Sequence, residues 1–403
     1  FRYSKEIRET FRAILERKGE VARILRMMHQ VGFLGRYLPE FGRLDCLVQH
    51  EFFHRYTADE HTLRCIEELD AVVDPGTSGR DQYRLLFHEI EDPYSIYLAL
   101  IGHDTGRAEN FREHIDGSAL LASKLCNRLQ IRGARRSLIT FLVDNHLSFW
   151  RFATSRNIED PDVVAEFARI VRTPQRLDAL LLFTYADSSG TNPEAWSGWK
   201  ESLMLQLHAS THSYLSQGGE QFAKSLESER LQLKEQTLSI LGENYTERVA
   251  EHFAAMPLRY FRFREPASVA THIRAVSQFV KREDKSTGSF DCAIQWIDHP
   301  ERGYTEFSVV TRDRPLLLEK ICCALASQQI NILSADLFTR GDGIVLDLFR
   351  VCTTNFEPVT NQPTQLRVVD TLHEINRQES YDSSRYLRRK KNFLSSTPTE
   401  IGR

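Results

Sequence analysis

The spacing of apolar residues in this 403-residue chain changes near Tyr304. Before that point, apolar side chains recur three and four residues apart, as in amphipathic helices; after it, they alternate with polar ones, as in strands. A chain of this length also exceeds one ordinary hydrophobic core. We therefore predict a mainly α domain followed by a small α+β domain.

Several separate helices are predicted before the change of pattern. Residues 1–50 are expected to form a helical lead-in. The sequence Thr57-Ala58-Asp59-Glu60 has the capping-box form and predicts that a helix begins there, because its hydroxyl and carboxylate can satisfy opposite backbone donors. From residue 213 to 300 the composition turns polar, which indicates a helical connector. An apolar helix is predicted over residues 94–102, and helices with 3.6-residue periodicity are predicted over residues 118–129, 136–147, 161–171 and 174–186.

The C-terminal pattern predicts a strand, a helix, a hairpin of two strands and a last helix, over residues 305–311, 315–326, 331–339, 344–352 and 365–377. This βαββα order is typical of ferredoxin-like α+β domains. No fourth strand is evident before Arg403, so we expect a domain over residues 301–380 whose sheet keeps an open edge. Residues 381–403 form a basic tail, which we expect to be solvated and mobile.

Composition narrows the classes of protein. The formal net charge of -3 gives no electrostatic footprint for nucleic acid, so a nucleic-acid partner is not expected. The sequence has no apolar run of bilayer-spanning length, and its seven cysteines show no CxxC pair, so we expect a cytoplasmic protein with reduced thiols and no membrane contact. The first residue is Phe1 rather than Met, which suggests a preceding segment in the native gene product.

Four possible metal ligands lie on or beside predicted helices: His61, the adjacent His103 and Asp104, and Asp187. Neutral imidazoles and carboxylates are ligands for divalent metals, and a carboxylate at the end of a strongly apolar helix needs a partner. A bundle that brings these side chains together would hold a hydrolytic metal centre. The alternative for the His-Asp pair is a helix-capping histidine beside a solvated aspartate.

His114 and His146 are candidate ligands of a second ion. His146 follows an apolar helix, so a hydrogen-bonded core histidine is an equal alternative there.

The chain resembles the bifunctional uridylyltransferase/uridylyl-removing enzymes of PII signal proteins in several short motifs, in this order: Leu34-Gly35-Arg36-Tyr37-Leu38-Pro39-Glu40-Phe41, Tyr56-Thr57-Ala58-Asp59-Glu60-His61-Thr62, His103-Asp104, Ala186-Asp187, Trp196-Ser197-Gly198-Trp199-Lys200 and Met256-Pro257-Leu258-Arg259-Tyr260-Phe261. The resemblance covers nearly the whole chain. It runs through that family's HD phosphohydrolase domain, over residues 51–212, into its first ACT domain.

The resemblance implies a domain that hydrolyses the phosphodiester between UMP and a tyrosine of a PII-like protein in nitrogen regulation. In that reading, a divalent metal, Mn²⁺ or Mg²⁺, activates water for in-line attack at phosphorus, and it is held by His61, His103, Asp104 and Asp187. The signature of the family's nucleotidyltransferase domain is absent from these residues. Transfer of UMP is therefore not expected of this chain as given.

The chain departs from the family pattern at two points near the centre. Arg107 stands where the family usually has Lys; it can clamp a phosphate but cannot act as a Lys-type proton donor, and we count it with His103 and Asp104 as catalytic. Asn145-His146 replaces a pair of histidines, which favours a mononuclear centre.

A third departure lies in the ACT-like domain. The run Asp313-Arg314-Pro315-Leu316 replaces Asp-Arg-Pro-Gly, and a leucine at the last position obstructs close approach of a ligand to the backbone. Asp313 and Asn331 are expected to contact the ammonium group of an effector such as glutamine. The equal alternative is a dimerisation or docking module without a ligand, through which a homodimer would form.

Three functions stay open at this point. The first is a metal-dependent phosphodiesterase that removes UMP from a PII-like protein and is regulated through its ACT domain. The second is a nitrogen-status sensor whose helical domain has lost its activity. The third is an HD hydrolase of small nucleotides. Stoichiometric metal in the purified chain would separate an enzyme from a scaffold.

Overall fold

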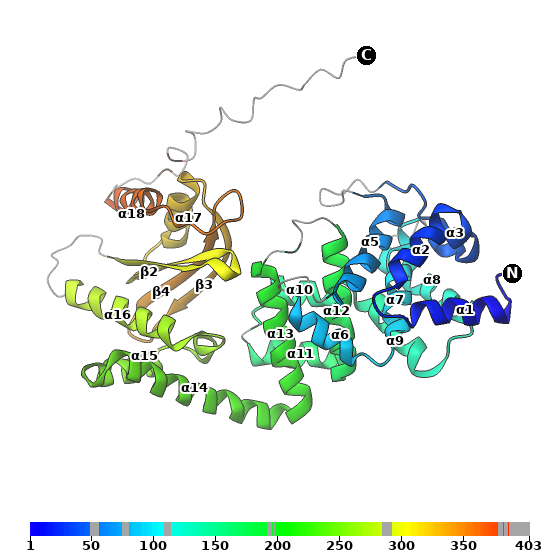
Figure 1. Cartoon of the computed structure of the whole chain (residues 1–403). Helices are drawn as coiled ribbons and strands as arrows, with labels where there is room; N and C mark the ends of the chain where they lie inside the picture. Colours follow the sequence, from blue (N-terminus) through cyan, green and yellow to red (C-terminus); the bar gives the residue numbers. More distant parts are fainter. Residues whose placement is uncertain are drawn as a thin grey trace, which may run out of the picture. The chain divides into compact units, whose positions relative to one another are not determined.

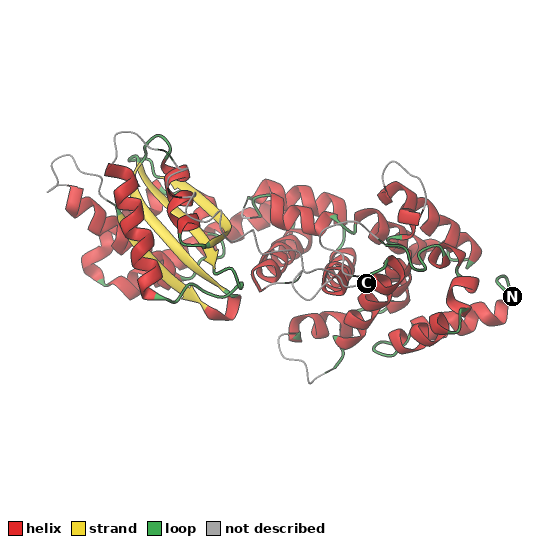
Figure 2. Ribbon diagram, turned by 90° about the horizontal axis from the view of Figure 1, so that it is seen from above, coloured by secondary structure: helices red, strands yellow, loops and turns green. Residues whose placement is uncertain are grey.

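The computed structural model describes residues 1–48, 56–74, 80–108, 114–158, 160–191, 196, 198–283, 292–377, 382 and 386. It divides into two compact units, Phe1–Ala223 and Lys224–Arg403, the first helical and the second built on a sheet (Figures 1 and 2). This confirms the predicted mainly α domain and small α+β domain. Apart from residues 382 and 386, the predicted tail lies outside the described residues. Among the described helices, none is both long and apolar enough to cross a bilayer.

The helical unit contains these elements: α1 (Lys5–Leu15), α2 (Val21–Gln30), α3 (Phe33–Tyr37), α4 (Pro39–Gly42), α5 (Ala58–Ala71), α6 (Asp81–Glu89), α7 (Pro93–Gly102), the 3₁₀ turn η1 (Thr105–Ala108), α8 (His114–Arg128), α9 (Gly133–Asn145), α10 (Ser148–Ser155), α11 (Pro161–Val171), α12 (Pro174–Thr191) and α13 (Gly198–Gln217). The next helix, α14 (Gly219–Leu241), crosses the boundary between the units.

Helix α7 lies in the core of this unit, because all ten of its residues are buried. Its sequence is apolar on every side, which is the pattern of a fully buried helix. Helix α12 is also largely buried and packs along α5. These three helices matter for function because α5 carries His61, α7 ends immediately before His103, and α12 carries Asp187.

Two details at these helices differ from the predictions. Helix α5 begins after Thr57, as expected, but the Thr57 side chain makes no capping hydrogen bond. Glu60 forms ion pairs with Arg26 and Arg64, which replace the reciprocal contact of a capping box. Helix α12 continues to Thr191, so that Asp187 lies within the helix and does not end it.

The second unit contains a four-stranded antiparallel sheet with strand order β1-β2-β4-β3. Its elements after α14 are η2 (Glu243–Tyr245), α15 (Thr246–Ala255), η3 (Leu258–Phe261), α16 (Pro266–Glu283), β1 (Ala293–His299), η4 (Pro300–Arg302), β2 (Tyr304–Arg312), α17 (Leu317–Ser327), β3 (Asn331–Thr339), β4 (Ile344–Cys352) and α18 (Gln362–Arg377). Strands β3 and β4 have the predicted ends.

Strand β1 was not predicted and lies in the range assigned to the connector. It pairs along β2 and covers the edge that we expected to be open, so the order is ββαββα. Apolar side chains on one sheet face, such as Phe338 and Leu346, share a core with α15 and α16. The opposite face, with Phe307 and Phe349, packs under α17 and α18 (Figure 1). Both faces of β2 and β4 are therefore buried.

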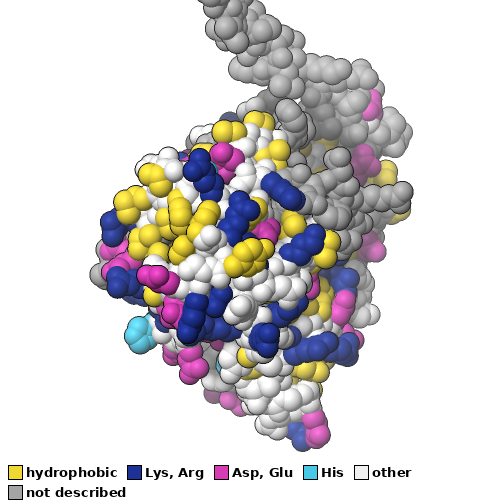
Figure 3. Space-filling view, turned by 90° about the vertical axis from the view of Figure 1, so that its right-hand side faces the viewer, with side chains coloured by type: hydrophobic (Ala, Val, Ile, Leu, Met, Phe, Trp, Pro, Cys, Tyr) yellow, Lys and Arg dark blue, Asp and Glu magenta, His cyan; other side chains and the backbone are white. Residues whose placement is uncertain are grey.

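The surface of the helical unit carries mixed charge on the side drawn in Figure 3. Lysine and arginine side chains alternate there with aspartate and glutamate, and exposed apolar side chains lie among them. This mixture accords with the small net charge of the whole chain.

Candidate metal centre

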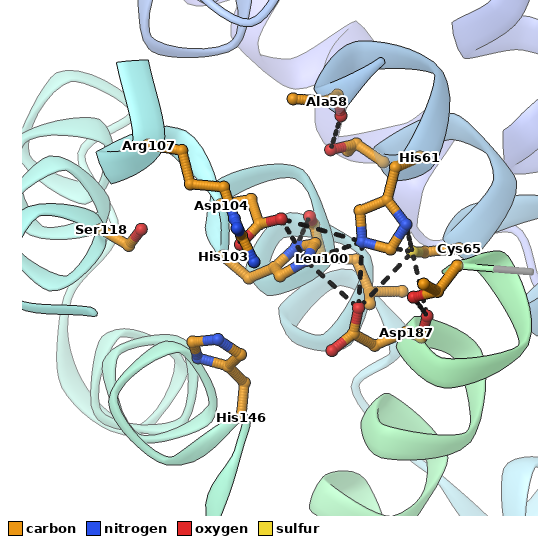
Figure 4. A network of polar contacts seen from close by, with 12 residues as sticks. Ala58, His61, Cys65, Leu100, His103, Asp104, Arg107, Ser118, His146 and Asp187 are labelled. Carbon is orange, nitrogen blue, oxygen red and sulfur yellow. Dashed lines mark hydrogen bonds and ion pairs between the residues drawn. The ribbon is translucent and has the colours of Figure 1, made fainter. Parts of the chain in front are cut away.

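Three buried helices bring together the side chains that the sequence singled out (Figure 4). His61 comes from the first turn of α5, the His103-Asp104 pair from the end of α7, and Asp187 from α12. His61, His103 and Asp104 are each about 1% exposed. Because α7 is apolar throughout, it carries the pair after it into the interior, where a polar side chain needs partners.

The potential ligand atoms lie close enough to share one ion. The Nε2 atoms of His61 and His103 are 3.3 Å apart. Asp187 Oδ1 lies 3.1 Å from His61 Nε2 and 3.4 Å from His103 Nε2. Asp104 Oδ2 lies 3.8 Å and 3.6 Å from the same two nitrogens. Ligands about 2 Å from a common metal have spacings of this order.

The chemistry of these side chains fits a divalent cation. Asp104 Oδ2 is buried and makes no hydrogen bond within the described part of the chain, although two imidazoles face it. His103 Nδ1 lies 2.7 Å from the carbonyl oxygen of Leu100. Since a carbonyl only accepts, Nδ1 carries a proton, and Nε2 is the ring nitrogen that faces the centre.

The charges in the centre are strongly coupled. Burial lowers the pKa of His103, but the carboxylates of Asp104 and Asp187 outweigh it and raise that pKa to about 9. Burial raises the pKa of Asp187, yet the two imidazoles hold it well below its ordinary value. Burial also raises the pKa of Asp104, but the charges of His103 and Arg107 outweigh it and lower that pKa. Both acids are therefore ionised, and a bound cation would take the place of the proton on His103.

Sequence reasoning did not place Cys65 among the ligands. Its Sγ lies 3.6 Å from the ring nitrogens of His61, and it belongs to a possible metal-holding group with His61, His103 and Asp187. The signal was available, because residues four apart share one helix face. Burial and the nearby carboxylates raise the pKa of the Cys65 thiol well above its ordinary value, so in the absence of a metal it is a neutral neighbour.

The close approach of α5 and α12 depends on Gly190. A Cβ atom on this residue would lie 2.7 Å from the Cys65 backbone nitrogen and 2.8 Å from Cys65 Sγ. A glycine here allows the two backbones to meet and brings Asp187 beside His61.

The other predicted residues occupy different positions. Arg107 lies in η1, and its Nε is 2.7 Å from Asp104 Oδ1. His146 lies beside the centre, with its ring centroid 5.6 Å from that of His103 and its Nδ1 bonded to the Val143 carbonyl (Figure 4). The side chain of His114 lies outside the described part of the structure.

The two expected effector residues do not meet within one chain. Asp313 follows β2, whose end at Arg312 pairs with Ile344 at the start of β4. Asn331 pairs with Cys352 at the opposite end of β4, and its amide donates to a backbone carbonyl. Parallel placement of β2 and β3 on either side of β4 thus separates the two residues by the length of that strand.

Comparison with known proteins adds to this geometry. No protein-family model matches the chain. The chain is 32% identical over 377 residues to a protein of Phenylobacterium zucineum named bifunctional uridylyltransferase/uridylyl-removing enzyme, a match that covers 92% of this chain and 39% of the relative. Proteins of the same name from Caulobacter vibrioides (32% over 348 residues; 85% and 36%) and Aliivibrio fischeri (28% over 374 residues; 92% and 42%) are also similar.

The chain is homologous to part of these bifunctional enzymes. It spans about two fifths of the length of the curated relatives that it matches. The resemblance noted from short motifs is thereby confirmed. The residues that converge in Figure 4 lie within the part of this chain that matches these relatives, because the first match covers 92% of the chain.

Proposed function

We propose that the helical unit is a metal-dependent phosphohydrolase of the HD type, which removes uridylyl groups from a PII-like signal protein. The observation that carries the proposal is the convergence of two imidazoles and two carboxylates, whose atoms lie 3.1–3.8 Å apart in pairs around one buried point. Homology to enzymes that bear the uridylyl-removing name supports this choice of substrate. Seven free cysteines accord with a reducing, cytoplasmic setting.

The chain's own residues would prepare the reaction. The ligands would be His61, His103, Asp104 and Asp187, with His146 a candidate for a second ion. When bound, Mn²⁺ or Mg²⁺ supplies Lewis-acid activation of water and shields the phosphoryl oxygens.

Arg107 has a separate role in this proposal. Its ion pair fixes the Asp104 carboxylate, and a planar guanidinium is a group that can clamp a phosphate oxygen. The turn that carries it is held by the Gly106 N–H, which donates to Ser118 Oγ at 2.9 Å.

The test is Mn²⁺-dependent release of UMP from a uridylylated PII protein. Removal of a ligand, by Asp187→Asn or Asp104→Ala, is expected to lower the rate by at least about 100-fold, because even orienting partners of a metal are worth 10- to 100-fold. Asp178→Asn is the matched control on the same helix; Asp178 pairs with His208 outside the centre and its loss should leave the rate unchanged.

The other outcomes separate the alternative functions. Turnover of small nucleotides without release of UMP from the PII protein would indicate a small-nucleotide hydrolase. Bound metal without turnover of either substrate would indicate a sensor that has lost its activity. An unaltered rate in Asp187→Asn would show that the chemistry takes place elsewhere.

We further propose that the sheet unit is an ACT-type regulatory domain. Its ββαββα order and the exposed Asp313 at the end of β2 support an amino-acid effector such as glutamine. Because Asn331 lies at the other end of the sheet, a ligand that contacts both residues requires two copies of the chain. Binding of glutamine and dimerisation should therefore depend on each other, which sedimentation with and without glutamine can measure.

A further inference from the structure

We infer that the helical unit holds a ligand site separate from the proposed hydrolytic centre, in a cavity beside the contact of α5 with α12 (the α5–α12 cavity), and that its ligand is a nucleoside. The cavity has a volume of about 390 Å³, within the range of small-molecule sites, which is roughly 300–1,000 Å³. Its lining comes from α5, α12 and α13 and from the residues just before α5, α6 and α13. Helices α5, α6 and α13 each pack against α12 (Figure 1).

Aromatic rings form one part of the cavity wall. Tyr185 and Trp196 both line it, with ring centroids 5.5 Å apart and ring planes nearly perpendicular. Tyr83 stacks on Tyr185 at 4.3 Å between centroids and thereby fixes its plane. Rings held in this way offer a preorganised surface to a flat heteroaromatic group, and every nucleobase has such a face.

Two arginines of the lining provide hydrogen-bond donors. Arg64 Nε lies 3.1 Å from Glu60 Oε1, and its guanidinium carbon lies 3.9 Å from the centre of the Tyr56 ring. Arg80 Nη2 lies 2.8 Å from Glu68 Oε2. A guanidinium has five N–H donors, and within the described part of the chain each of these two donates to its glutamate through a single nitrogen. The remaining donors suit the carbonyl oxygens at the edge of a base.

The charges around the cavity favour an uncharged ligand over an ionic one. Each arginine of the lining is already paired with a glutamate, and Glu67 pairs with Arg26. A base and a ribose carry no charge, so they fit surroundings whose charges are already compensated. Glu201 also lines the cavity; burial raises its pKa, although contacts with Tyr83 and Trp196 oppose this. A carboxyl group in such a place can accept from a ribose hydroxyl.

The cavity and the hydrolytic centre lie on different sides of α12. Tyr185 and Ser189 both line the cavity, and residues four apart share one face of a helix. Asp187 lies between them in the sequence, and side chains two residues apart on a helix diverge by about 200° around its axis. The carboxylate proposed as a metal ligand is therefore directed away from the cavity.

An occupant would nevertheless rest against the contact on which the hydrolytic centre depends. Gly190 lines the cavity, and its backbone lies against that of Cys65. The two helices that meet there carry His61 and Asp187 (Figure 4). A nucleoside in the α5–α12 cavity would thus brace the helices that hold the proposed metal ligands without itself reaching the metal.

The experiment is calorimetric titration of one pyrimidine and one purine nucleoside, uridine and adenosine, into the whole chain, stripped of metal and kept in a chelator. The wild type should bind at least one of them, with one nucleoside per chain. Asp187→Asn should bind it equally well, because neither a metal nor Asp187 takes part. Since no reaction is measured, failure of the proposed hydrolysis would not change this result. Loss of binding in Asp187→Asn would place the nucleoside at the hydrolytic centre and overturn the inference.

Two substitutions in the lining should weaken binding. Arg80→Met removes hydrogen-bond donors and should lower the affinity by about 10-fold or more. Trp196→Leu removes a stacking surface and should lower it by roughly 5- to 150-fold. Arg156→Met is the matched control and should keep the wild-type affinity. Arg156 also pairs with a glutamate, Glu166, and lies over a ring, that of Phe152, but it is not part of the cavity lining.

A third variant covers substitutions that disturb the fold. Ser189→Phe directs a ring into the cavity from the half-buried face of α12, so it should keep a melting temperature near that of the wild type and abolish binding. Wild-type affinity in this variant would overturn the inference, as would failure of the wild type to bind either nucleoside at millimolar concentration. Binding of glutamine that Ser189→Phe abolishes, without binding of a nucleoside, would assign the cavity to an amino acid and overturn the ligand class.

Discussion

Asp104 in the helical unit and Glu306 in the sheet unit are both buried carboxylates beside histidines, but among the described residues Asp104 Oδ2 lacks a hydrogen-bond partner, whereas neither oxygen of Glu306 does. His272 Nε2 lies 3.1 Å from Glu306 Oε1, and Arg264 Nη1 lies 3.5 Å from Oε2. The second nitrogen of His272 bonds to the Tyr260 hydroxyl at 2.9 Å. This network is complete without a ligand, whereas Asp104 Oδ2 faces two imidazoles and accepts no hydrogen bond among the described residues.

The comparison shows that burial alone does not identify a site. Burial raises the pKa of Glu306, but His272 and Arg264 lower it to about 2. The acids of the proposed metal centre also have lowered pKa values. The metal centre differs because its potential ligand atoms are directed at one common point and do not satisfy one another by hydrogen bonds. A complete network of this kind fastens helices to a sheet; an incomplete one is available to a cation.

The prediction with the largest expected effect concerns Arg264. Its side chain is 5% exposed and joins the segment between η3 and α16 to the sheet through Glu306 and Asp336. Arg264→Met should destabilise the sheet unit by about 3–5 kcal/mol, because it leaves a buried carboxylate with only part of its compensation. Chemical denaturation followed by a probe in the sheet unit measures this loss.

The control for Arg264 is Arg302→Met. Arg302 pairs with Glu265 at the surface, where both side chains are substantially exposed, and its loss should cost less than about 1 kcal/mol. Equal losses in the two variants would show that the Glu306 network is no more important than a surface pair.

The next effect concerns Asp347, a buried carboxylate of β4 that pairs with no cation among the described residues. Burial and the charge of Asp313 raise its pKa from 3.8 to about 7. Between these values the folded chain keeps a proton that the unfolded chain releases, so the free energy of unfolding falls as pH rises and levels off above about pH 7. Asp347→Asn should remove this slope and stabilise the sheet unit by about 2–4 kcal/mol at pH 8.

The test is to measure the free energy of unfolding of the wild type and of Asp347→Asn between about pH 4 and pH 8. Asp313→Asn should reduce the slope without removing it, because burial is the larger cause. A slope of the wild-type size in Asp347→Asn would assign the proton to another group.

These two regions also differ in how far the sequence predicted them. Around the metal centre, α7 and α12 are long apolar segments, and the turn at Gly341-Asp342-Gly343 separates β3 from β4, so the existence of these elements was predictable, although α12 extends past its predicted end to Thr191. Strand β1 was missed because its side chains are mostly half-buried at a sheet edge, and its role depends on pairing with Tyr304–Arg312. Registers of this kind are tertiary information that a local pattern does not contain.

The burial of the candidate site was also predictable from the local sequence, but its full set of residues was not. His103-Asp104 follows a helix that is apolar on all sides, so its burial could be inferred. Cys65 was overlooked because a lone cysteine in a helix also serves as a small core residue. The separation of Asp313 from Asn331 follows from the antiparallel register through β4, which no motif records.

A smaller effect tests how closely the hydrolytic centre depends on packing. Gly190→Ala would place a Cβ within 3 Å of the Cys65 backbone, where atoms cannot give way cheaply. We expect a loss of about 1–3 kcal/mol in stability, and weaker metal binding because α12 carries Asp187 away from His61. Gly102→Ala is the matched control, since a Cβ there meets nothing within 4 Å. Equal metal affinity in both variants would show that the centre tolerates movement of α12.

The smallest effect concerns Leu316, which stands where the ACT-type motif has glycine. Its φ of 62° lies in the left-handed region, and its side chain is 57% exposed. A leucine is strained in this conformation, whereas glycine adopts it freely, so Leu316→Gly should stabilise the sheet unit by about 1 kcal/mol while it opens the backbone to a ligand. Denaturation and glutamine titration of the same variant separate the two consequences. A stability gain without glutamine binding would favour a docking module, and loss of stability would show that the Leu316 side chain packs in solution.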